Sequence, residues 1–61
     1  MNKMDLYLVT TKTQSCNDVE IPYGTRGKVI GIKIDDDEAW FLLEFENGEK
    51  WWYIQYLVDN E

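Results

Sequence analysis

The sequence predicts an all-β fold, a small antiparallel barrel of five short strands. Residues 40–58 hold two alternating apolar segments joined by Asn47-Gly48, and an Asn-Gly pair between such segments is a strong hairpin signal. Residues 6–11 and 28–34 are rich in β-branched and aromatic side chains, which favour strands. The polar stretch between them, residues 12–22, has no helical period, so it predicts a long loop.

The hairpin turn decides which side chains share a face of the sheet. If Asn47 and Gly48 are the two loop residues, Leu43 lies opposite Trp52, and directly opposed residues share a face. The face predicted to form the core is uniformly apolar and carries Phe41, Leu43, Phe45, Trp52 and Ile54. The other face mixes aromatic and acidic residues: Trp40, Leu42, Glu44, Glu46, Trp51 and Tyr53. We therefore expect Trp52 to be buried and Trp51 to be more exposed.

The strand over residues 28–34 is predicted to be bent. Strict alternation gives it no clean apolar face, whereas a bulge near Ile30-Gly31 would let Val29 and Ile32 both point inward.

Shorter elements complete the prediction. Val19 and Ile21 alternate within the long loop and predict a short ordered piece. An acidic turn follows the bent strand, and one 3₁₀ turn over Gln55–Leu57 precedes a last short strand at Val58.

Composition places narrow limits on the protein. Its 61 residues allow one domain, predicted over residues 1–61 with an ordered core at about 5–58. With one cysteine, Cys16, and no histidine, neither an internal disulfide nor a structural zinc site can form. The net charge of −6 disfavours direct binding to nucleic acid or anionic membranes. No apolar run could span a bilayer or serve as a signal peptide, so we expect a reducing, cytoplasmic setting.

Two stretches resemble the SH3-like small β-barrels. One is Ile-Pro-Tyr-Gly-Thr-Arg-Gly-Lys-Val-Ile-Gly-Ile, and the other is Phe-Leu-Leu-Glu-Phe-Glu-Asn-Gly-Glu-Lys-Trp-Trp, with Tyr-Leu-Val after it. The layout is similar to the SH3-like type found in photosystem I and to short SH3-like proteins of phages and prophages, mostly of unknown function. The positions that carry the resemblance are Gly24, Gly27, Val29, Ile32, Phe45, Gly48, Trp52 and Leu57. The resemblance implies a barrel that binds a ligand, and the fold does not name that ligand.

The mixed face of the hairpin is the predicted binding surface. Tryptophan and tyrosine dominate the energetically important contacts of protein interfaces, so this face indicates a non-catalytic protein-interaction module. The predicted partner-binding residues are Trp40, Trp51, Tyr53, Asp35, Asp36, Asp37, Glu38 and Glu44. A chain this short cannot cover both faces of its hairpin, which leaves apolar area to a partner or to a second copy. The competing interpretation is that the long loop and the first strand cover the stripe.

The acidic residues support an alternative function. Twelve carboxylates on a small rigid fold could imitate a phosphate track and occupy the basic groove of a DNA- or RNA-binding enzyme. The run 35–38 lacks the twelve-residue calcium-loop spacing, so no metal is predicted. No histidine is present to activate Cys16 or a hydroxyl, so neither catalysis nor a cofactor is predicted.

Overall fold

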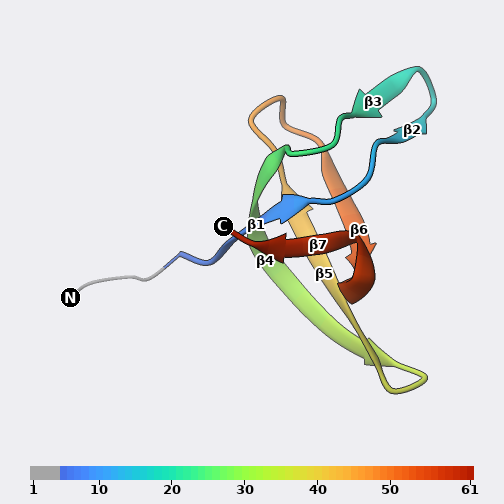
Figure 1. The fold of residues 1–61 in the computed structure, drawn as a ribbon, viewed down its shortest axis with the longest axis vertical. Coiled ribbons are helices and arrows are strands. Elements are labelled where there is room, and N and C mark those ends of the chain that lie inside the picture. The colour runs from blue at the N-terminus through green and yellow to red at the C-terminus, as the bar shows by residue number, and fades with distance from the viewer. Residues whose placement is uncertain (1–4) are drawn as a thin grey trace.

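Seven β-strands and one 3₁₀ turn make up the part of the chain that the structure describes (Figure 1). The structure is a computed structural model that describes residues 5–61. Residues 1–4 of the predicted domain, 1–61, lie outside the described residues. The elements are β1 (Tyr7–Thr10), β2 (Gln14–Cys16), β3 (Val19–Ile21), β4 (Arg26–Asp35), β5 (Glu38–Glu44), β6 (Lys50–Ile54), η1 (Gln55–Leu57) and β7 (Val58–Asn60). The predictions of an all-β fold and of a 3₁₀ turn at Gln55–Leu57 are confirmed.

The strands form two sheets and not a closed five-stranded barrel. Five strands pair antiparallel in the order β6-β5-β4-β1-β7, and β2 and β3 form a separate hairpin. Within residues 5–61, β6 and β7 do not pair with each other, so the larger sheet stays open. The strand count differs because the polar segment after β1 pairs with itself around Asn17 and Asp18, both of which have positive φ (52° and 66°). Such a turn suits a tight hairpin even where the flanking strands are polar.

The turn between β5 and β6 has three loop residues, so the predicted register is wrong by one position. The Phe45 and Glu49 backbones bracket Glu46, Asn47 and Gly48, since the Phe45 N–H donates to the Glu49 carbonyl at 2.9 Å. Gly48 has a φ of +89°, whereas Asn47 is not in the left-handed region that a type I′ turn requires. The Asn47 side-chain oxygen instead accepts a hydrogen bond from the Glu49 N–H at 3.0 Å.

This shift exchanges the faces of β6. Leu43 lies opposite Trp51, and Leu42 lies opposite Trp52. Trp51 packs against the core, whereas Trp52 is 44% exposed. The predictions that Trp52 is buried and Trp51 more exposed are therefore wrong, because a one-residue slip moves every side chain of a strand to the opposite face.

The bend in β4 follows the prediction. The pairing with β5 shifts between Val29 and Gly31, which places the extra residue of a bulge at Ile30. Val29 packs against the core. Ile32 lies opposite Phe41 on the same side, but it is 59% exposed because β4 and β5 extend beyond the core. Figure 1 shows this ribbon of β4 and β5 projecting from the rest of the molecule.

The core is formed by side chains from the inner face of the larger sheet together with Ile21 of β3. It consists of Leu8, Ile21, Leu43, Phe45 and Tyr53. Thr10 is the buried polar residue beside it.

Thr10 connects β1 to the segment before β4. The Thr10 hydroxyl donates to the Pro22 carbonyl at 2.8 Å and accepts from the Thr25 N–H at 2.9 Å. These two hydrogen bonds offset the cost of burying the hydroxyl, so the contact fixes the start of β4 against β1.

The turn between β4 and β5 is strained, which leads to a stability prediction. Asp36 and Asp37 both have positive φ (51° and 62°), a conformation that glycine adopts more readily than aspartate. Asp37→Gly is expected to raise the free energy of unfolding by about 1 kcal/mol, measured by urea denaturation. Asp37→Ala is the matched control, because it removes the same charge but keeps a Cβ. Equal gains in both variants would assign the effect to charge and not to the backbone.

Candidate functional site

An aromatic surface lies on the outer face of the sheet, the side away from the core. Leu42 is paired with Trp52 and Trp40 with Ile54, so these four side chains share this face across β5 and β6. Their neighbours Leu43 and Tyr53 point the other way and are buried. We call Trp40, Leu42, Trp52 and Ile54 the outer patch. Trp52 is its exposed member, and the other three are half-buried.

Gly31 makes room for the Trp52 ring. A methyl group added at Gly31 would lie 3.3 Å from Leu42 Cβ and 3.6 Å from Trp52 Cη2. The indole therefore reaches across β5 as far as β4, where Gly31 has no side chain. The ring lies over three strands, and this arrangement widens the apolar surface that one tryptophan offers.

Lys33 lies on the same face and places a cation over the patch. Its Nζ is 4.7 Å from the Trp52 ring centroid and 5.9 Å from the Trp40 ring centroid. Both distances are within the range of cation–π attraction. The patch therefore already holds one positively charged group of its own chain.

Carboxylates lie at both ends of the patch. Asp35 and Glu38 are directly opposite each other on the outer face, one row beyond Lys33 and Trp40. Glu38 accepts a hydrogen bond from the Tyr56 hydroxyl, which raises the pKa of Tyr56 above its usual value. At the other end, Glu44 lies 4.0 Å from the Lys50 ammonium.

The structure divides the predicted binding residues between two faces. Trp40, Asp35, Glu38 and Glu44 lie on the outer face, with Asp36 and Asp37 at the adjoining turn.

Trp51 and Tyr53 lie on the inner face, where their rings stack with centroids 6.4 Å apart. Tyr53 is 2% exposed, and burial raises the pKa of its hydroxyl. Neither residue belongs to the binding face, because the three-residue turn reverses the orientation of β6. Sequence reasoning missed Trp52 and Lys33. The two-residue turn assigned Trp52 to the core, and the lysine gave no signal of its own.

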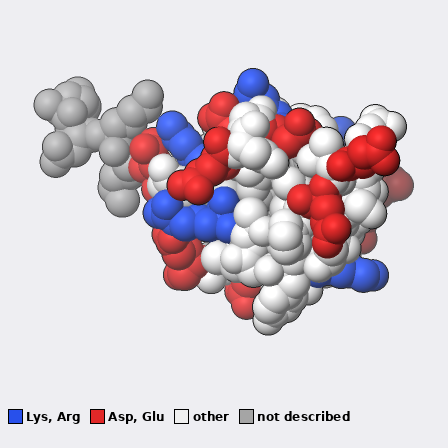
Figure 2. Space-filling model, turned by 90° about the horizontal axis from the view of Figure 1, so that it is seen from above, with Lys and Arg blue, Asp and Glu red and all other residues white. Residues whose placement is uncertain are grey.

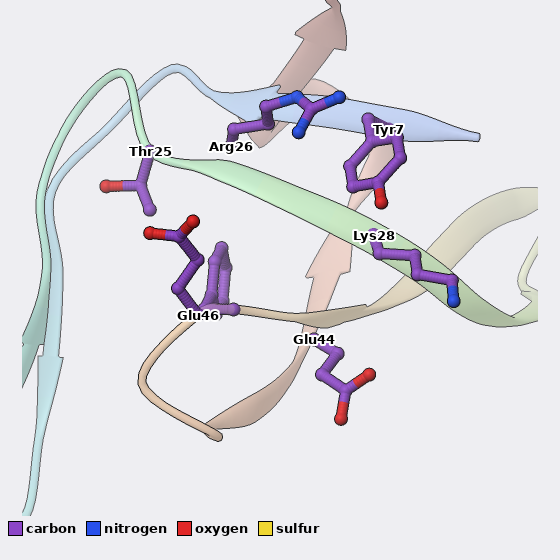
Figure 3. Close-up of a pocket in the computed structure, with 7 residues that line it drawn as sticks. Tyr7, Thr25, Arg26, Lys28, Glu44 and Glu46 are labelled. Carbon is purple, nitrogen blue, oxygen red and sulfur yellow. The ribbon is translucent and has the colours of Figure 1, made fainter. Parts of the chain in front are cut away.

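A depression also lies on the outer face, between β1, β4 and the end of β5. Its volume is about 470 Å³. Figure 3 labels Tyr7, Thr25, Arg26, Lys28, Glu44 and Glu46 of its lining, to which Phe45 also belongs.

The cations of this depression already have partners. The Arg26 guanidinium lies 3.7 Å from the Tyr7 ring centroid and is paired with Glu61, whose hydrogen bond raises the pKa of Arg26. The Lys28 Nζ lies 3.8 Å from the Asp5 Oδ1. Because these charges are compensated within the chain, the depression gives weaker support for a ligand than the outer patch does.

The described residues offer no cluster for a metal ion. Within residues 5–61, no group of three or more Cys, Asp or Glu side chains has an arrangement that could hold one, and Cys16 is a free, exposed thiol. The same part of the chain has no helix that is both long and apolar enough to cross a membrane.

Fold and patch together describe a small all-β protein with an uncovered aromatic surface. The sequence matches no protein-family model, and no curated protein or solved structure matches the chain.

Proposed function

We propose that the protein is a non-catalytic interaction module that binds another protein through the outer patch. The observation that carries this proposal is the Trp52 indole, which is 44% exposed and lies over Gly31 of β4. Tryptophan is highly buried on average, and it is among the residues that most often anchor protein interfaces.

The carboxylates around the patch define the rim of the proposed interface. Asp35 and Glu38 at one end and Glu44 at the other are exposed or half-buried on the same face. Charges at such a rim act on the rate of association and on partner choice more than on the lifetime of the complex. A partner with a basic rim fits this arrangement.

The alternative function, an acidic mimic of nucleic acid, has less support. Lys28 and Lys50 lie on the same face as Glu44, and Lys50 forms an ion pair with it. Figure 2 shows basic side chains interspersed among acidic ones at the end of the molecule that it presents. A mimic of a phosphate track needs an unbroken row of negative charge.

An SH3-like relationship and a cytoplasmic location are also part of the proposal. The bulge in β4, the long segment before it and the 3₁₀ turn before the last strand support the relationship. The single free cysteine supports a reducing compartment.

Trp52→Ser is expected to weaken binding to the partner by at least about 2 kcal/mol if Trp52 is an anchor. The partner is recovered from an extract of the native cell, and affinity is measured by surface plasmon resonance at low and high salt. Tyr23→Ser is the matched control, because Tyr23 is 72% exposed and lies outside the patch. Normal binding by Trp52→Ser, together with competition by DNA and a steep loss of affinity at high salt, would favour the acidic mimic instead.

A further inference from the structure

The projecting half of β4 has one unpaired edge. β1 pairs with β4 only from Arg26 to Lys28, and the last contact along this edge is the Val29 N–H donating to the Leu6 carbonyl at 2.8 Å. From Gly31 to Asp35, β4 pairs with β5 on one side and, within residues 5–61, with no strand on the other. In Figure 1 this edge runs along the outside of the projecting ribbon.

The side chains along this edge are unusually apolar for a solvent-facing strand. Ile32 is 59% exposed and Ile34 is 69% exposed, both on the side of the ribbon that continues from the core. An exposed edge strand with apolar side chains is a template for pairing with another strand, and soluble proteins usually block or cover such edges.

The outer face of the same edge carries charges of both signs, and none of them forms an ion pair within the described residues. Lys33 has cation–π contacts but no carboxylate within ion-pair distance in the described chain, while Asp35 and Glu38 face each other without a basic partner. Directly opposed like charges destabilise a strand pair. A strand that placed a cation beside Asp35 and a carboxylate beside Lys33 would relieve both defects.

A second copy of the chain meets this requirement in one antiparallel register. With Ile34 opposite Ile34 of the second copy, each Lys33 lies opposite Asp35 of the other chain. A register centred on Lys33 would oppose two lysines. A register centred on Ile32 would bring Asp35 of the second copy to Val29, whose edge Leu6 already occupies. We propose that two copies of the chain associate in this Ile34-centred register through the free edge of β4.

The proposed dimer is symmetric and weak. A two-fold axis at Ile34 uses the same patch on both copies, as an isologous interface requires. Only a short stretch of strand is joined, so the interface falls below about 1,200 Å², the size of transient encounters. The proposed dimer uses Asp35 of the rim and Lys33 beside the outer patch, but it leaves Trp40, Leu42, Trp52 and Ile54 uncovered, so the proposed function does not require it.

Sedimentation equilibrium of the wild-type protein between about 10 µM and 1 mM tests the proposal, since small interfaces bind weakly. The average mass is expected to rise from 7.3 kDa toward twice that value. Lys33→Asp or Asp35→Lys alone should weaken self-association at least about tenfold, because each change places like charges opposite at two symmetric positions. Combining Lys33→Asp with Asp35→Lys should restore it. Lys12→Asp, a charge reversal at an exposed loop position, is the control and should have no effect of this kind.

Dilution of the wild-type protein, followed residue by residue in ¹H–¹⁵N spectra, gives a second test that needs no variant. Shifts that depend on concentration are expected at residues 32–36. A mass of 7.3 kDa at every concentration would overturn the proposal. Self-association that survives both single charge reversals, or that is lost in Trp52→Ser instead, would also overturn it.

Discussion

Tyr53→Ala is expected to leave the chain largely unfolded at 25 °C. Tyr53 is 2% exposed and is the largest side chain of the core, where its ring lies 5.9 Å from the Phe45 ring and 6.4 Å from the Trp51 ring. Truncation of a buried aromatic residue costs about 3–5 kcal/mol, and a domain of this size has little more stability than that. Circular dichroism with thermal and urea denaturation measures the effect.

Tyr53→Phe separates the ring from its hydroxyl. The Tyr53 hydroxyl is buried and has no hydrogen-bond partner in the described chain, so its removal should leave stability unchanged or raise it by about 1 kcal/mol. Tyr23→Ala, at a 72% exposed position, should stay within about 0.5 kcal/mol of the wild type. A cooperative melt of Tyr53→Ala near the wild-type temperature would contradict the core described above.

Gly27→Ala is expected to cost about 2–3 kcal/mol, because the core has no room for a methyl group at this position. A Cβ on Gly27 would lie 2.8 Å from Phe45 Cε1 and 3.0 Å from Leu43 Cβ, and both residues are buried. Relief would require the Phe45 ring, which packs against Tyr53, to shift. Urea denaturation measures the loss.

Gly31→Ala is the matched control on the outer face. Its Cβ would lie 3.3 Å from Leu42 Cβ, and the nearby Trp52 ring borders solvent, so the neighbours can adjust. We expect a cost below about 1 kcal/mol. An equal loss of stability in the two variants would contradict the view that Gly27 is more closely packed than Gly31.

The sequence was sufficient to predict the approximate positions of β1, β4, β5, β6 and β7, but it predicted neither the pairing of β2 with β3 nor the hairpin register. An Asn-Gly pair suits a two-residue turn, and it equally suits a three-residue turn in which glycine alone takes positive φ. The choice here depends on the Asn47 side chain accepting from Glu49 and on Phe45 being held in the core. The hydrogen bond is local to the turn, whereas the burial of Phe45 is a tertiary contact, which no local pattern contains.

The two turns with positive φ at two successive residues have a weaker sequence signal than Asn-Gly. Asn17-Asp18 and Asp36-Asp37 carry positive φ at both positions without any glycine. The bulge in β4 was predictable, because Gly31 interrupts a strand whose alternation otherwise fails on both faces.

The candidate site could be predicted only in part. Trp40, Asp35, Glu38 and Glu44 were assigned to the binding face and lie on the outer face. Trp52 was placed in the core because its orientation depended on the turn. The position of Lys33 over the rings depends on the bulge, which sets the phase of β4 relative to β5.

The pairing of β1 with β7 has a consequence for the order of folding. Strands β4, β5 and β6 pair with their neighbours in sequence, whereas Leu8 pairs with Asn60 across nearly the whole chain. The entropy lost in closing a loop grows with its length, and distant pairings therefore form late. The meander of β4, β5 and β6 is expected to be the folding nucleus, and β1 and β7 should join it together in a last, rate-limiting step.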